Sequence, residues 1–166
     1  MRLPRLVPQP ASKHDALVDK ATREAESGRR LAMFDRETGL YAHWYLARRF
    51  EEEARRSERY DRPLSVIAME VHCQDEAYRV QDELRAWLDQ SLRSTDLASH
   101  LGGGRYIALL TETELEDASA IAARIAERFP DTVNIGLGCF PEDGSKLEDV
   151  QKVAERRAHG NWRLAI

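Results

Sequence analysis

The sequence predicts an α+β fold, in which helices cover a central mixed or antiparallel β-sheet. Helix-forming segments alternate with short apolar runs, so most of the expected strands are separated by helices. Two of these runs, at 96–101 and 106–110, flank three consecutive glycines, as expected for a β-hairpin. The chain has 166 residues, which is enough for one domain with a hydrophobic core. An N-terminal helix is expected before this domain.

Composition and charge narrow the class of protein. The chain is 42% hydrophobic and carries a formal net charge of -4, so it offers no broad basic surface for sequence-blind nucleic-acid binding. Cys73 and Cys139 lack metal-type spacing and are expected to be free thiols in a reducing compartment. No apolar run approaches the length of a membrane span. We therefore expect a cytoplasmic protein without a cofactor, a nucleic-acid partner or a membrane contact.

The N-terminal part is expected to differ from the rest. Residues 1–12 contain three prolines and are predicted to form a flexible leader. Residues 13–34 are dense in Ala, Glu, Arg and Lys, which favour a helix. Their apolar positions form only a weak stripe, so this segment is either a solvated helix or a stalk that pairs with its copy in a homodimer. The remaining residues, 35–166, form the predicted domain.

The first half of this domain contains the strongest strand signal of the chain. Residues 64–71 are almost continuously apolar and are predicted to be buried on both faces. Glu70 interrupts this run near its end, either as an edge residue that faces solvent or as the remnant of a site. Residues 42–59 and 75–92 have the apolar periodicity of helices. The apolar face of the first of these helices is predicted to comprise Trp44, Leu46, Ala47, Phe50 and Ala54.

The second half begins with the glycine turn. Gly102 to Gly104 are expected to include positive φ angles, which residues with side chains rarely adopt. Thr113 and Glu116 have the spacing of a capping box and predict a helix through Arg128. Residues 133–140 predict another strand, 145–159 a last helix, and 160–166 a candidate short strand. The core face of the helix that ends at Arg128 is predicted to comprise Leu115, Ala118, Ile121, Ala122 and Ile125.

Five segments resemble, in their order along the chain, the motifs of one family. They are Asp35-Arg36-Glu37-Thr38-Gly39-Leu40, Arg62-Pro63-Leu64-Ser65 with the strand that follows, Gly102 to Tyr106, Val133 to Gly138, and Gly160-Asn161-Trp162-Arg163. Together they resemble the GGDEF domain of diguanylate cyclases over about residues 34–164. The resemblance implies a nucleotidyl cyclase-like palm. It also implies a reaction that joins two GTP molecules into cyclic di-GMP on magnesium-bound phosphates.

The residues that this chemistry uses in the family are altered here. The acid at the third position of the signature loop is replaced by Gly104, and the Glu that follows it by Arg105. Glu70 stands where the other metal ligand, an Asp, is expected. Residues 72–78 lack the family's guanine-holding Phe-Lys-x-x-Asn and Gly-Asp, and His159 lies nearest to the place of its phosphate-contacting Lys. The resemblance therefore implies a degenerate domain that is not an enzyme and holds no metal.

A second site of the family binds the product through an Arg-x-x-Asp motif just upstream of the signature loop. Arg93 and Asp96 occupy that place. A guanidinium can fork onto O6 and N7 of guanine or onto a phosphate, and a carboxylate can accept from N1 and N2. Arg124 lies where the family often supplies a second arginine. The alternative is an exposed salt bridge between Arg93 and Asp96. The spacing alone has little weight, because it recurs at Arg79 and Asp82 and at Arg128 and Asp131.

The sequence thus predicts a receptor that binds cyclic di-GMP at Arg93, Asp96 and Arg124 and no longer makes it. Ligand binding would be converted into a homodimer or protein contact through the N-terminal helix. The competing prediction is an interaction or dimerisation scaffold that kept the fold and binds no ligand. An active cyclase is the least favoured of the three.

Overall fold

The computed structural model describes residues 13–73 and 75–159. The predicted leader at 1–12 and the segment 160–166, with its Gly160-Asn161-Trp162-Arg163 motif, lie outside the described residues. The chain separates into two compact units, Met1–Met33 and Phe34–Ile166. None of the helices in the described ranges is both long and apolar enough to cross a membrane.

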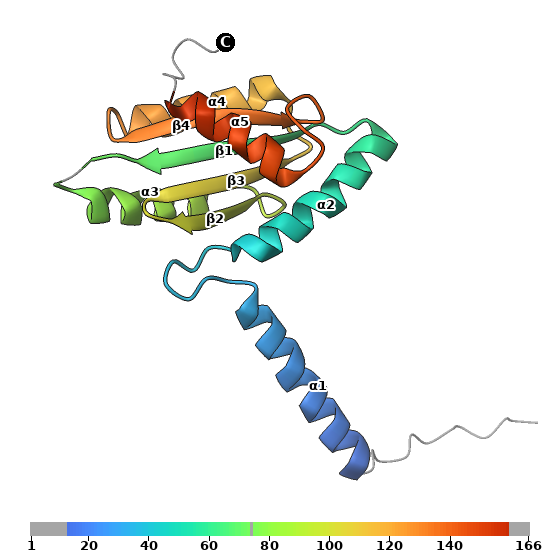
Figure 1. Cartoon of the computed structure of the whole chain (residues 1–166). Coiled ribbons are helices and arrows are strands. Elements are labelled where there is room, and N and C mark those ends of the chain that lie inside the picture. The colour runs from blue at the N-terminus through green and yellow to red at the C-terminus, as the bar shows by residue number, and fades with distance from the viewer. Residues whose placement is uncertain (1–12, 74, 160–166) are drawn as a thin grey trace, which may run out of the picture. The chain divides into compact units, whose positions relative to one another are not determined.

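The first unit contains the helix α1, Lys13–Ala32, which confirms the helix predicted there (Figure 1). Residues 20–28 of this helix are all exposed. Lys20 and Glu24 lie one helical turn apart and form an ion pair of 3.9 Å, which contributes little at this exposure. The pairing of α1 with a second copy stays a prediction.

The second unit is built on one four-stranded sheet in the order β2-β3-β1-β4. The strands are β1, Leu64–Val71, β2, Leu97–Gly102, β3, Arg105–Thr111, and β4, Val133–Phe140. All three strand pairings are antiparallel, so the sheet is antiparallel rather than mixed. The helices that cover it are α2, His43–Tyr60, α3, Ala77–Ser91, α4, Leu115–Arg128, and α5, Leu147–His159. The α+β fold class predicted from the sequence is confirmed.

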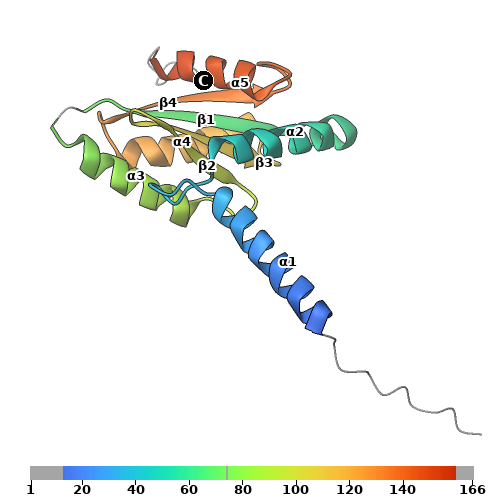
Figure 2. The same ribbon diagram turned by 60° about the horizontal axis from the view of Figure 1, so that its bottom comes forward.

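Helices cover both faces of the sheet (Figures 1 and 2). On one face, Ile67 and Met69 of β1 share a buried cluster with residues of α3 and α4. On the other face, Val66 and Ala68 share a second cluster with residues of α2 and α5. Burial on both faces explains why β1 reads as a continuous apolar run, as predicted. A fully buried side chain of this kind contributes about 1.5–3 kcal/mol.

Two glycines of β4 allow α5 to lie close to the sheet. A Cβ atom on Gly136 would collide with the backbone carbonyl oxygen of Ala154, and one on Gly138 would come within 2.7 Å of the Val150 carbonyl oxygen. The close packing expected of this glycine-rich strand is confirmed, and it holds α5 directly against β4.

The hairpin between β2 and β3 is tight. Gly102, Gly103 and Gly104 have φ angles of 85°, 61° and 75°, as the three glycines predicted. Gly102 pairs with Arg105, and the carbonyl oxygen of Gly104 accepts a 2.9 Å hydrogen bond from the N–H of Val71. The turn therefore closes onto the end of β1, next to Glu70.

Three local predictions were wrong. The N-cap of α4 is Glu114, without a side-chain cap, and the Thr113 hydroxyl donates instead to the Thr111 carbonyl oxygen at 2.8 Å. Trp44 is 51% exposed. It precedes the buried Leu46 by two residues, or about 200° around the helix, and so faces away from the sheet. Leu115 is 47% exposed. It is the first residue of α4, where a helical side chain leans past the helix end.

Candidate functional site

The turn between α3 and β2 contains the predicted Arg93 and Asp96. The Asp96 N–H donates to the Arg93 carbonyl oxygen at 3.0 Å. The Asp96 carboxylate accepts from the Arg93 N–H at 3.2 Å and from the Thr111 N–H at 3.1 Å. Asp96 is 6% exposed, so this carboxylate is an internal brace that joins the turn to β3.

Arg93 is exposed, in contrast to Asp96. The two residues meet through the backbone N–H of Arg93 and not through a salt bridge between their side chains. Within the described part of the chain, the Arg93 guanidinium has no hydrogen-bond or ion-pair partner. A planar cation with five unused donors is well suited to an anionic or acceptor-rich ligand.

A cavity of about 180 Å³ adjoins this turn. Arg93 and Asp96 line it from the turn between α3 and β2, and Phe34 and Tyr41 line it from the segment before α2. Asp89 of α3 lines it as well. The cavity thus combines aromatic rings, one unpaired guanidinium and carboxylates within a small volume.

The Asp-x-x-Thr-Gly-Leu segment folds into a closed turn that forms one wall of this cavity. Asp35 accepts from the N–H of Thr38 at 2.8 Å and from its hydroxyl at 2.7 Å. These hydrogen bonds hold the pKa of the Asp35 carboxyl below its usual value of 3.8. Gly39 has a φ angle of 72°, and Leu40 is buried in the core. The motif therefore sets the position of Phe34 and Tyr41 through a buried anchor.

Arg124 lies on α4, and its guanidinium carbon sits 5.5 Å from the centroid of the Trp87 ring on α3. This cation–π contact orients the side chain along the α3 and α4 face of the sheet. Arg124 is not among the residues that line the 180 Å³ cavity. The structure thus brings Arg93 and Asp96 together and places Arg124 on the same side of the sheet, outside the cavity.

Three of the residues that the resemblance places at the family's catalytic positions also come together. Glu70 and Arg105 are directly opposite each other on β1 and β3. The His159 Nε2 atom lies 3.1 Å from a carboxylate oxygen of Glu70. All three line a cavity of about 310 Å³, next to Tyr106, whose pKa is raised to about 12 by burial. Among the described residues, no group of three or more His, Cys, Asp or Glu side chains could hold a metal ion.

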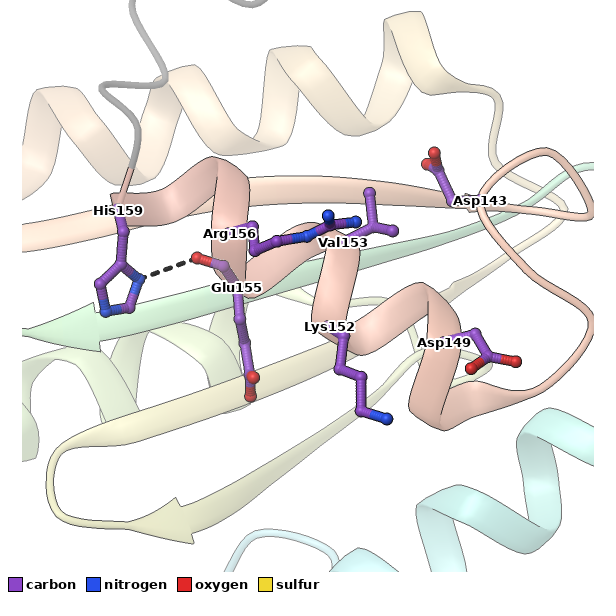
Figure 3. A pocket seen from close by; sticks show the side chains of 7 residues that line it. All are labelled: Asp143, Asp149, Lys152, Val153, Glu155, Arg156 and His159. Atoms are coloured by element: carbon purple, nitrogen blue, oxygen red, sulfur yellow. Dashed lines mark hydrogen bonds between the residues drawn. The ribbon is translucent and has the colours of Figure 1, made fainter.

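A third hollow, of about 810 Å³, runs along the outer side of α5 (Figure 3). Its charged residues are of both signs, with Lys152 and Arg156 beside Asp149 and Glu155. Burial raises the pKa of Asp143 at its edge, but hydrogen bonds from Arg157 and Cys139 outweigh this effect and leave the pKa lowered. The sequence does not indicate this hollow, because mixed charges on a helix are typical of any solvated face.

The chain matches known proteins both by a family model and by the fold of solved structures. A model of the family described as "GGDEF-like domain" matches residues 48–143. This match covers more than half of the chain, and the chain therefore belongs to the GGDEF-like domain family. A comparison with curated proteins found no match.

Solved structures show the same fold. A sensory box/GGDEF family protein from Caulobacter crescentus is 20% identical, with 80% of this chain and 99% of that chain covered and a TM-score of 0.68. The coiled coil and GGDEF domain of DgcB from C. crescentus, in complex with c-di-GMP, is 14% identical, with 89% and 90% covered and a TM-score of 0.74. The diguanylate cyclase SiaD from Pseudomonas aeruginosa, in complex with its activator SiaC, is 20% identical, with 91% and 66% covered and a TM-score of 0.70.

Proposed function

We propose that this GGDEF-like domain is a cytoplasmic receptor for cyclic di-GMP that does not catalyse its synthesis. One observation carries the proposal. The Arg93 guanidinium stands exposed and without a partner in the described structure, at the rim of a cavity and at the place of the family's product-binding motif. The complex of DgcB with c-di-GMP supports it, because that protein combines the same fold with this ligand.

The three predicted residues have different roles in this proposal. Arg93 forks onto a guanine edge or a phosphate of the ligand. Asp96 holds the turn that presents Arg93, through its two hydrogen bonds to backbone N–H groups. Arg124 supplies a second positive charge from α4, next to the ring of Trp87. Ligand binding is therefore expected to depend directly on the two arginines and indirectly on Asp96.

The proposed lack of catalysis rests on the contents of the other cavity. Glu70 is opposite Arg105 in the strand register, and its carboxylate lies 3.1 Å from the Nε2 atom of His159, a contact that a magnesium ion would have to displace. Gly104 adds no side chain at the loop position where the family has an acid. Two GTP-bound metal ions need several hard oxygen ligands, and this arrangement supplies few.

The output of the receptor is proposed to pass through α1. In this hypothesis, occupancy of the Arg93 site changes a homodimer or a contact with a protein partner. Size-exclusion chromatography with light scattering, with and without cyclic di-GMP, tests the hypothesis. An unchanged mass with both the free and the ligand-bound chain would leave the homodimer form of the hypothesis without support.

Isothermal titration calorimetry with cyclic di-GMP tests the receptor function itself. The wild type is expected to bind, and Arg93→Ala to weaken binding by about tenfold or more. Arg79→Ala is a matched control, because Arg79 belongs to another Arg-x-x-Asp pair but is bonded to Glu76 and Glu83. Absence of binding by the wild type at tens of micromolar would refute the receptor function and favour the scaffold alternative.

A further inference from the structure

The cavity beside Arg93 contains a carboxylate that the Arg-x-x-Asp motif does not include. Asp96, the acid of the motif, is 6% exposed and already accepts from two backbone N–H groups. Asp89 lines the same cavity from α3, is exposed, and has no hydrogen-bond or ion-pair partner among the described residues. Asp89 is thus the carboxylate that can meet a ligand without disturbing the turn.

The same cavity has an aromatic wall. The rings of Phe34 and Tyr41 stack with their centroids 4.8 Å apart, and those of Tyr41 and Tyr45 with their centroids 5.3 Å apart. Tyr41 is therefore held between two rings, and Phe34 ends the row. Phe34 is 43% exposed although it lines the cavity. Exposed apolar area of this size, backed by other rings, is a suitable platform for stacking a flat base.

We propose that this cavity accepts one guanine base, with Phe34 as the stacking platform, Arg93 on the O6 and N7 edge, and Asp89 on the N1 and N2 edge. The inference rests on the proposed function and specifies how the same site selects its ligand. In this proposal, Asp89 accepts hydrogen bonds from the guanine base, and Asp96 holds the turn in position.

The size and the charges of the cavity agree with a single base. A volume of about 180 Å³ accommodates a purine ring system but not a whole cyclic dinucleotide. The remaining base and the phosphates of the ligand would then lie outside, towards the surface. Arg124 is located on that same side of the sheet, over Trp87.

The pair of charged groups also predicts a preference for guanine over adenine. Guanine presents acceptors at O6 and N7 and donors at N1 and N2, which complement a guanidinium and a carboxylate. Adenine has a donor at its 6-amino group and an acceptor at N1. The guanidinium would therefore face a donor, and the carboxylate would face an acceptor. Asp89 and Arg93 do not form an ion pair with each other, and both are therefore available to the base.

Calorimetry with cyclic di-GMP on the full chain tests this assignment. Asp89→Asn is expected to weaken binding by about fivefold or more, because the amide presents a donor to the guanine donors. Phe34→Leu is expected to weaken binding by a similar factor through lost stacking. Asp82→Asn and Tyr78→Leu are matched controls on α3, at residues that do not line the cavity, and their affinities are expected to stay within about twofold of wild type.

Competition with cyclic di-AMP supplies a readout that a purely structural role would not change. The wild type is expected to prefer cyclic di-GMP, and Asp89→Asn to reduce that preference. Thermal melts show whether each variant is folded at the temperature of the titration. Wild-type binding that Arg93→Ala abolishes, with Asp89→Asn and Phe34→Leu equal to their controls, would overturn this assignment and leave the receptor function standing. No binding by the wild type would refute both.

Discussion

The two cavities beside the β2–β3 hairpin differ in whether the acidic side chains that line them have partners. In the cavity beside the α3–β2 turn, Arg93 and Asp89 have no partners within the described structure. In the cavity at the ends of β1 and β3, Glu70 lies opposite Arg105 and 3.1 Å from a nitrogen of His159. The Asp89 carboxylate in the first cavity is therefore without a partner among the described residues, whereas the Glu70 carboxylate in the second already contacts an imidazole nitrogen.

Under the proposed function, this difference is the physical basis on which the domain would bind cyclic di-GMP without making it. A carboxylate that already contacts another polar side chain gains less from binding a cation, because the cation must displace that contact. Unpaired charges at a rim remain solvated and can exchange water for a ligand. Both cavities are supported by the same sheet, and they differ in the side chains that line them.

The largest expected effect is on stability and compares one carboxylate from each cavity, Asp96 and Glu70. Asp96→Ala leaves two N–H groups without an acceptor and is expected to lower the free energy of unfolding by about 2–4 kcal/mol. Glu70→Ala removes a partly exposed carboxylate and is expected to cost less than about 1 kcal/mol. Urea denaturation measures both. Equal losses for the two variants would contradict the structural role given to Asp96.

The next effect is on affinity and compares one arginine from each cavity. Arg93→Ala is expected to weaken cyclic di-GMP binding by about tenfold or more, with unfolding free energy unchanged within about 0.5 kcal/mol. Arg105→Ala is expected to leave the affinity within about twofold of wild type, because Arg105 lines the other cavity. A larger loss for Arg105→Ala would move the ligand to the strand-end cavity.

A third prediction concerns the turn that carries Phe34 and Tyr41. Thr38→Val removes the hydroxyl that donates to Asp35 and is expected to cost about 1 kcal/mol of unfolding free energy. The folded pKa of Asp35 is lowered, so its contribution to stability is present above its usual value of 3.8 and is lost as the pH falls through the folded value. The difference between wild type and Thr38→Val is therefore expected to shrink as the pH falls from 6 to below that usual value. A pH-independent difference in chemical denaturation would argue against this coupling.

The smallest expected effect is on catalysis. The double variant Gly104→Asp, Arg105→Glu restores acids to the signature loop, yet we expect no cyclic di-GMP from GTP, because residues 72–78 still lack the family's guanine-holding groups. It is expected to cost about 1–2 kcal/mol of stability, because Gly104 has a φ angle of 75°. Product detected by chromatography with the wild-type chain would refute the proposed lack of activity. Product with the double variant alone would show that the loop is what blocks catalysis.

Much of the fold could be predicted because local patterns are sufficient for it. The apolar run at 64–71 gave the bounds of β1, and three glycines gave the positive φ angles of the hairpin. Exposure was less predictable, as Trp44 shows, since a helical period alone does not say which side faces the sheet. Asp89 was missed as a site residue. The spacing of four residues before Arg93 was its available signal, and such a spacing is common in charged helices.

The sequence by itself determined the alternation of helices and strands, the hairpin, and the family to which the domain belongs. The elements and the hairpin follow from periodicity and from residues with special backbone freedom, which act over a few positions, and the family follows from the resemblance of five short motifs in order. Only the tertiary structure decided that Asp96 points inward as a brace, that Glu70 meets His159, and that Phe34 shares a cavity with Arg93. Contacts between residues far apart in the chain depend on how helices pack on the sheet, and no local pattern records that packing.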